Sequence, residues 1–363
     1  MAARLRIAVN TGGGDAPGLN AVIYAVTHSA RQRGWDVLGI RRGYAGLLDT
    51  SEVVELTPER VAGIVAIGGT IIGTTNKGDP FALPVRGEGG KIEQIDVSDR
   101  IVENFRKLGL DCLVAVGGDG SLRIAQRLSK KGIPVVGVPK TIDNDIEATL
   151  LTFGFDTAVT TATEAIDKLH STASAHERVM VVEVMGRHAG WIALHSGVSG
   201  SADVILMPEI PFDLDKVCRR ILENEQGKRY AIVVAGEGAR PKGGNVIHKG
   251  AGELGRQDVV LGGVAEWVAK EISARTGKDT RSLVLGHLQR GGSPTTFDRL
   301  VALRFGAAAV RFIADGQRNV MVAHRPPSMI PVPLEAAVGR TKTVPLDSDT
   351  VVTARELGIS FGD

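Results

Sequence analysis

The sequence predicts an α/β protein built as two doubly wound lobes, with mainly parallel sheets that carry helices on both faces. Short apolar runs of four to six residues alternate with stretches of helical period. Continuous apolar runs are typical of strands buried on both faces of a parallel sheet. The length of 363 residues corresponds to roughly two domains of about 150 residues each.

The expected elements alternate along the chain. Strands are predicted at residues 5–10, 37–40, 112–116, 134–138, 179–184, 204–207, 230–235, 282–285 and 320–323. Helices are predicted at residues 19–33, 100–108, 122–131, 157–169, 215–223, 260–275 and 298–314. Several helices are followed by a glycine that suits a left-handed stop: Gly34, Gly109, Gly132, Gly277 and Gly316. The glycine-rich residues 240–255 are expected to form a surface loop, and the proline-rich residues 325–333 a connector.

Composition excludes several classes of protein. The 43 basic and 41 acidic residues give a net charge of +2 with no long block of one sign, so a nucleic-acid partner is not expected. The two cysteines, Cys112 and Cys218, are isolated and predict neither a disulfide framework nor a cysteine metal site. Because the first apolar run is too short for a signal peptide and no stretch reaches a membrane span, we expect a cytoplasmic protein without a membrane partner.

Two glycine-rich loops each connect an expected strand to an expected helix. They are residues 11–18, with the letters TGGGDAPG, and residues 117–121, with the letters GGDGS. Such loops allow backbone N–H groups to approach an anion at a helix N-terminus. Either loop alone is equally consistent with a tight turn, but together they favour a ligand rich in phosphate. Asp119 would repel that ligand unless a cation lies between them, which indicates Mg²⁺.

Charged residues follow other expected strands. Residues 139–145, with the letters PKTIDND, place Asp143 and Asp145 at a strand exit, where one carboxylate can take a proton from an attacking hydroxyl. An ordinary Asx-rich turn is the alternative. Arginine suits bidentate phosphate binding, and four arginines flank buried strands: Arg178, Arg187, Arg281 and Arg290. The pattern predicts a second, phosphate-bearing substrate.

Six motifs together resemble the 6-phosphofructokinase family, over about residues 5–315. They are GGDAPG at 13–18, GGDGS at 117–121, PKTIDND at 139–145, GFDTA at 154–158, VEVMGR at 182–187 and GHLQRGGSP at 286–294. The resemblance implies the fold of that family, with the active site between two lobes. It implies a donor lobe of residues 1–154 plus about 289–325, a sugar-phosphate lobe of residues 155–288, and a C-terminal extension of residues 326–363 that packs on the lobes.

The same resemblance implies phosphorylation of the 1-hydroxyl of fructose 6-phosphate by ATP and Mg²⁺. Asp143 then matches the general base, Thr141 orients it and Asp145 accompanies it; Arg187, Gly14 and Lys140 complete the catalytic set. The donor positions are Gly14, Lys77, Gly78, Gly118, Asp119, Gly120 and Ser121, and Asp119 is the Mg²⁺-linked residue. The sugar-phosphate positions are Thr141, Ile142, Asp143, Arg178, Met185, Gly186, Arg187, Glu237, Arg281, His287, Leu288, Gln289 and Arg290.

The donor is the main point on which the chain departs from the family pattern. In the family pattern, typical bacterial ATP-dependent members have glycine at the positions that match 120 and 140. Pyrophosphate-dependent members have aspartate and lysine at these positions. This chain combines Gly120 with Lys140. An aspartate at position 120 would crowd the nucleotide, so Gly120 favours ATP, and a pyrophosphate-dependent enzyme is the alternative. Asn76 stands where many ATP enzymes have an arginine, and Lys77 is expected to take over a donor contact.

The resemblance also bears on assembly and regulation. Arg178 matches an arginine that reaches a neighbouring subunit, which implies a homodimer or homotetramer. Tyr24, His28 and His170 replace effector-binding arginines, so weak or absent allosteric control is expected. NAD and lipid kinases share the GGDG loop but not the sugar-phosphate arginines. A non-catalytic regulatory subunit is disfavoured because Asp119 and Asp143 are both present.

Overall fold

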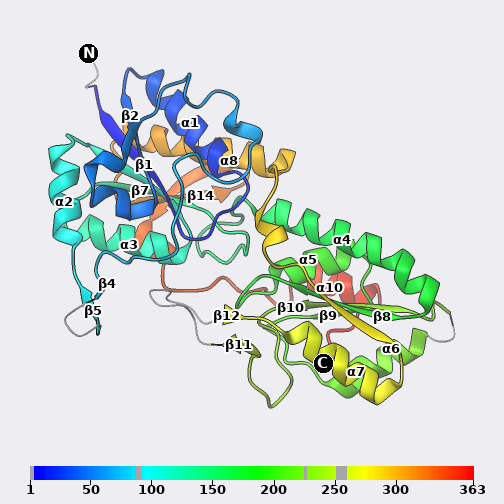
Figure 1. The fold of residues 1–363 in the computed structure, drawn as a ribbon. Coiled ribbons are helices and arrows are strands. Elements are labelled where there is room, and N and C mark those ends of the chain that lie inside the picture. The colour runs from blue at the N-terminus through cyan, green and yellow to red at the C-terminus, as the bar shows by residue number, and fades with distance from the viewer. Residues whose placement is uncertain (1–3, 87–90, 225–226, 251–259) are drawn as a thin grey trace.

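The computed structural model describes residues 4–86, 91–224, 227–250 and 260–363, and it shows two lobes, each built around its own sheet (Figure 1). The first sheet has the strand order β15-β14-β7-β6-β1-β2-β3. Its strands are β1 (Arg6–Gly12), β2 (Asp36–Ile40), β3 (Val53–Glu55), β6 (Cys112–Gly117), β7 (Val135–Pro139), β14 (Val320–Arg325) and β15 (Ser328–Pro333). Neighbouring strands are parallel except at the two edges, where β15 and β3 are antiparallel.

Helices cover both faces of the first sheet because its strand residues alternate between two apolar clusters. Ile7 and Val9 of β1 pack against α1 (Leu19–Arg31) and α8 (Thr296–Ala314), whereas Ala8 belongs to the cluster on the opposite face. The helices of that opposite face are α2 (Ser98–Lys107), α3 (Asp119–Lys130) and the short α9 (Leu334–Ala337). Short 3₁₀ turns lie at η1 (Gly43–Leu47), η2 (Thr50–Glu52) and η3 (Ile64–Ala66).

The second lobe repeats this arrangement on a parallel sheet of order β13-β8-β10-β9. Its strands are β8 (Val179–Val184), β9 (Val204–Leu206), β10 (Ala231–Gly236) and β13 (Thr280–Val284). One face carries α4 (Phe155–His176), α5 (Trp191–Ser199) and α10 (Asp349–Glu356), and the other carries α6 (Leu214–Glu223) and α7 (Val264–Thr276). The fold class predicted from the sequence is therefore confirmed.

The chain passes between the lobes after β7, again before α8, and once more after α9, so the C-terminal end belongs to the second lobe (Figure 1). The last segment packs on both lobes. Leu334 lies in the core of the first lobe, whereas Val351 and Phe361 lie in the core of the second. A bridge between Ser360 and Val204 places the end of the chain beside β9.

Four predicted elements were wrong or incomplete. The helix predicted at residues 157–169 is longer, because α4 continues to His176. Residues 325–333 are not a connector, because β15 forms an antiparallel hairpin with β14; its prolines are tolerated on an edge strand, where an N–H is not required on the outer side. The predicted helix 260–275 begins only at Val264, after Gly262 and Gly263 with φ of 129° and 93°. Residues 260–261 instead form β12 (Val260–Leu261), which pairs with β11 (His248–Gly250) within the predicted loop 240–255; residues 251–255 of that loop lie outside the described residues.

Some elements were not predicted at all. They are the strand β3, the helices α5, α9 and α10, and the hairpin of β4 (Leu83–Arg86) with β5 (Ile92–Ile95). In contrast, the five predicted glycine stops all have positive φ, between 62° and 92°. Helix ends were therefore easier to read from the sequence than short or irregular elements.

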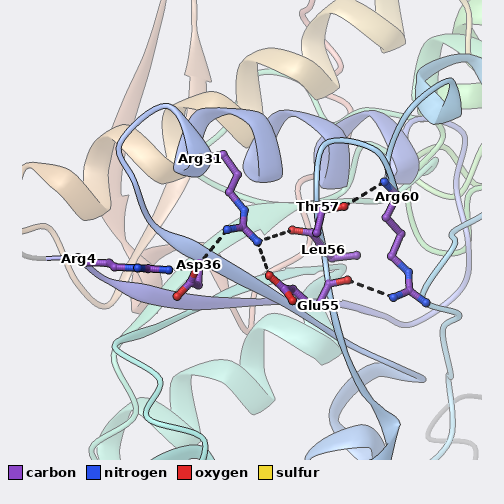
Figure 2. A network of polar contacts seen from close by, with 7 residues as sticks. All are labelled: Arg4, Arg31, Asp36, Glu55, Leu56, Thr57 and Arg60. Carbon is purple, nitrogen blue, oxygen red and sulfur yellow. Dashed lines mark hydrogen bonds and ion pairs between the residues drawn. The ribbon is translucent and has the colours of Figure 1, made fainter.

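A charged network holds the outer edge of the first sheet (Figure 2). The Arg31 guanidinium at the end of α1 donates to Asp36 at 3.1 Å and to Glu55 at 2.6 Å, and so links α1 to β2 and β3. Arg4 pairs with the same Asp36 carboxylate at 3.0 Å and holds the pKa of Asp36 below its usual range. Charged side chains on an edge strand also discourage pairing with another chain. Over the described residues, no helix has the length and apolar character that crossing a membrane requires.

Candidate active site

A cleft of about 440 Å³ lies at the carboxyl edge of the first sheet and is the candidate site. Ligands of open α/β sheets bind beyond the carboxyl ends of the strands, at the point where the strand order reverses. The order β7-β6-β1 brings the loops after these three strands to one edge. Those loops line the cleft together with residues 75–79 and with Arg187, Arg290 and Arg340.

The two glycine loops lie side by side because Gly12 and Gly117 are partners in the register of β1 and β6. A Cβ at either glycine would collide with the Ser121 side chain, so only glycine permits this approach. Tyr44 donates its hydroxyl to the Ser121 carbonyl at 2.7 Å and fixes the first turn of α3. The resulting surface exposes Gly120 at the start of a helix, where backbone N–H groups and the helix dipole favour an anion.

Lys140 is buried beneath these loops. Its ammonium group donates to the Gly14 carbonyl. Burial is the main cause that lowers the pKa of Lys140 to about 7, and the Arg290 guanidinium lowers it further, whereas Asp15, Asp143 and Asp145 oppose the shift. A nearby phosphate would add to these carboxylates and favour the charged ammonium.

Asp143 and Asp145 lie in the turn after β7. Asp143 is only 4% exposed, and its Oδ1 is a buried oxygen without a hydrogen-bond partner among the described residues. Its Oδ2 lies 4.0 Å from Nη2 of Arg290, and its N–H donates to the Thr141 hydroxyl at 3.0 Å. Burial, followed by the Asp143 charge, raises the pKa of Asp145 to about 6. The turn therefore presents one free carboxylate oxygen within a site that disfavours a second negative charge.

Residues after three parallel strands of the second lobe form a second group of predicted site residues. Glu237 accepts the Arg187 N–H at 3.1 Å, and Gln289 accepts the Met185 N–H at 2.9 Å. Gly186 has a φ of 141°, which a side chain would not tolerate, and it lets the chain turn directly after β8. Burial, followed by the Asp143 charge, raises the pKa of Glu237.

Asp119 is the candidate ligand for a cation. Its carboxylate pairs with Arg123 and accepts the Gly339 N–H at 2.8 Å. Among the residues that the structure describes, no group of three or more His, Cys, Asp or Glu side chains could hold a metal. One carboxylate with lone pairs to spare fits Mg²⁺ that is bound mainly through substrate phosphates.

Arg178 and Arg281 lie away from the cleft. Both contact the Asp279 carboxylate, at 2.6 Å and 2.5 Å, where β8 and β13 begin. The six residues of β8 span about 20 Å at ~3.3 Å per residue, so these arginines are at the opposite edge of the sheet from the cleft.

The predicted positions differ in whether they line the cleft. Lining the cleft are Gly14, Lys77, Gly78, Gly118, Asp119, Gly120, Ser121, Lys140, Thr141, Asp143, Asp145, Arg187 and Arg290. Ile142 is fully buried, and η6 (Gly286–Arg290) leaves His287 and Leu288 exposed.

Sequence reasoning missed several residues of the cleft. Tyr44 comes from η1, which follows β2, and Arg123 lies in α3 one turn after Asp119. Arg340 and Thr341 come from the C-terminal extension. The spacing of Asp119 and Arg123 at i and i+4 was a usable signal, whereas nothing local in the sequence points to Arg340.

Comparisons with known proteins agree on the family of this chain, although the relatives are named for different donors. The family model described as Phosphofructokinase matches residues 6–313. The chain is 51% identical over 359 residues to "ATP-dependent 6-phosphofructokinase" of Chloroflexus aggregans, which covers 99% of this chain and 98% of the relative. It is 46% identical over 360 residues to "Pyrophosphate–fructose 6-phosphate 1-phosphotransferase" of Streptomyces coelicolor, with 99% and 100% covered. The crystal structure of Pichia pastoris phosphofructokinase in the T-state superposes with a TM-score of 0.80 at 31% identity and covers 99% of this chain and 37% of that one.

Proposed function

This chain belongs to the phosphofructokinase family, and we propose that it transfers the terminal phosphoryl group of ATP to the 1-hydroxyl of fructose 6-phosphate. The products are fructose 1,6-bisphosphate and ADP. The observation that carries the proposal is the buried Oδ1 of Asp143, which has no hydrogen-bond partner among the described residues and belongs to the cleft that the glycine loops, Arg187 and Arg290 also line. A reaction of this kind requires a proton acceptor between a phosphate donor and a phosphorylated acceptor.

Asp143 is assigned as the general base. Its free Oδ1 accepts the proton of the 1-hydroxyl as the oxygen attacks, and Thr141 holds the backbone of the turn. Asp145 accompanies Asp143 and shares its electrostatic environment. Positive charge from Arg187 and Lys140 offsets the charge of the transferring group, which supplies most of the catalysis in phosphoryl transfer.

The donor is assigned to the glycine loops. Gly14, Lys77, Gly78 and residues 118–121 all line the cleft, and the Lys140 ammonium donates to the Gly14 carbonyl. Asp119 would hold Mg²⁺ on the donor phosphates; the ion would neutralise charge between these phosphates. Exposed Gly120 leaves room for a nucleotide, which favours ATP. Pyrophosphate is the second candidate donor, because one full-length relative is named for it.

The acceptor is assigned to the second group of site residues. Arg290 and Arg187 provide guanidinium groups for the sugar phosphate, and Met185, Gly186 and Glu237 shape the pocket beside them. Since Arg178 and Arg281 cannot reach the cleft of their own chain, we assign them to the cleft of a second copy. This makes the functional unit a homodimer or a homotetramer. Cytoplasmic localisation stays a prediction.

The proposal is tested by initial rates with fructose 6-phosphate and Mg²⁺, with ATP and pyrophosphate compared at matched concentrations. Turnover with ATP alone is expected. Turnover with pyrophosphate alone would show that Lys140, rather than Gly120, determines the donor. The absence of turnover with either donor would refute the assigned reaction.

A further inference from the structure

Residues 339–344 cross the cleft as a strap, and they lie beyond the segment matched by the family model. The strap touches both carboxylate-bearing loops of the first lobe. The Gly339 N–H donates to Asp119 at 2.8 Å, and the Lys342 N–H donates to the Asp145 carbonyl at 2.9 Å. Between these contacts Thr341 forms a bridge with Ile146. The strap therefore spans the opening between the start of α3 and the turn after β7.

The strap is firmly held on its C-terminal side. The half-buried Lys342 ammonium donates to the Asn144 side chain and to the carbonyls of Thr149 and Leu150, each at 3.0 Å. The Trp191 indole donates to the Lys342 carbonyl at 2.8 Å. In the second lobe Glu209 accepts the Val344 N–H at 2.9 Å. Because backbone and side-chain contacts fix both sides of Arg340, its position over the cleft is set by the fold.

Arg340 is the residue for which these contacts leave no explanation. It is exposed and lines the cleft, and within the described part of the chain its guanidinium makes no hydrogen bond or ion pair. Its neighbours Gly339 and Thr341 are each in a fixed contact, and Cα atoms two residues apart are separated by at most about 7 Å. The backbone at Arg340 is therefore held close to Asp119, and the Arg340 side chain lines the same cleft as the glycine loops. Asp119 already has Arg123 as its ion partner.

We propose that Arg340 binds the diphosphate end of the phosphoryl donor, so that the C-terminal strap completes the donor side of the cleft. This inference rests on the proposed phosphofructokinase function. A guanidinium offers five donors in a planar fork, which matches two phosphate oxygens at once. The diphosphate is common to ATP and pyrophosphate, so the assignment does not depend on which donor is used.

The test compares Arg340→Gln and Arg340→Lys with the wild type and with Arg33→Gln. Arg33 is an exposed arginine that follows the C-terminal end of α1. It lies away from the cleft and serves as a matched control. Steady-state kinetics give separate KM values for donor and fructose 6-phosphate. Calorimetry without turnover measures binding of a non-hydrolysable ATP analogue and of pyrophosphate, and thermal unfolding reports on the fold.

For Arg340→Gln we expect the donor KM and both dissociation constants to rise about 10- to 100-fold, as for a lost hydrogen bond to a charged group. The KM for fructose 6-phosphate and the unfolding temperature should match those of Arg33→Gln, and Arg340→Lys should recover part of the loss. Unchanged binding of both ligands, or weaker binding of the ATP analogue alone, overturns the assignment to the diphosphate. Wild-type protein inactive with either donor would instead refute the proposed function, and the binding data would still decide on Arg340.

Discussion

Replacing Asp143 by asparagine tests the assignment of the general base. The substitution keeps the shape of a buried side chain whose Oδ1 has no partner to lose among the described residues, so the fold should persist. Loss of a positioned general base costs about 100- to 10,000-fold in rate, which corresponds to about 3–5 kcal/mol of barrier. The change also removes the charge 4.0 Å from Arg290. Because that guanidinium is then less neutralised, affinity for the sugar phosphate should be retained.

The matched control is Asp145→Asn, which makes the same chemical change two residues along the same turn. Both variants are assayed for fructose 1,6-bisphosphate over a range of pH, and binding of fructose 6-phosphate is measured separately. In the wild type the pKa of Asp145 is raised to about 6, so activity should fall as the pH drops through about 6 and this carboxylate takes up a proton. Without the Asp143 charge, the second cause of that shift is lost. The residual activity of Asp143→Asn should therefore decline at a lower pH than wild-type activity does.

Turnover of Asp143→Asn within about ten-fold of wild type would refute the base assignment, since removal of a base costs more than this. A larger loss for Asp145→Asn than for Asp143→Asn would transfer the role to Asp145. Loss of fructose 6-phosphate binding in Asp143→Asn would show instead that the carboxylate acts in substrate binding.

Three further predictions follow from the same geometry. Gly120→Asp adds a carboxylate to the donor side of the cleft and should lower kcat/KM for ATP by about ten-fold or more. Unchanged ATP kinetics would show that Gly120 does not determine the donor. Arg178→Ala should raise the KM for fructose 6-phosphate by about ten-fold while the donor KM stays constant, and unaltered kinetics would remove Arg178 from the neighbouring cleft. His170 has both ring nitrogens engaged, with the Tyr230 hydroxyl at 3.1 Å and the Gly200 carbonyl at 2.7 Å. Saturation with fructose 6-phosphate should therefore be hyperbolic and insensitive to ADP or phosphoenolpyruvate, and a sigmoidal curve reversed by ADP would contradict this.

Much of the cleft was predictable because parallel strands concentrate their loops at one edge. Residues 5–10, 112–116 and 134–138 were each recognised as buried strands from continuous apolar runs, and the structure pairs them as neighbours. Once those strands were assigned, the glycine loops and the turn with Asp143 had to meet. The signals were local, so no long-range contact had to be known in advance.

The missed parts share a dependence on distant contacts. The strap reaches Asp119 across 220 positions of sequence, and its polar residues show neither helical nor alternating period. The strand β15 contains prolines at its end and middle, which read as a connector until β14 is found beside it. The strand β3 has only three residues, too few to show a period. In each case tertiary pairing decides the structure, and local sequence preference does not.

The cleft contains two buried titratable groups, Lys140 and Asp145, whose charged forms are disfavoured by burial. Burial lowers the pKa of Lys140 from 10.5 to about 7 and raises that of Asp145 from 3.8 to about 6, so both shifts favour the neutral forms. For Lys140 the unfolded chain binds more protons than the folded chain between about pH 7 and 10.5, and stability contributed by this group rises with pH in that window. A donor phosphate beside Lys140 supplies the missing negative charge and raises its pKa again. Because a donor phosphate stabilises the charged form of Lys140, the same interaction favours donor binding. This gives a buried lysine at this position a function that an apolar side chain would not have.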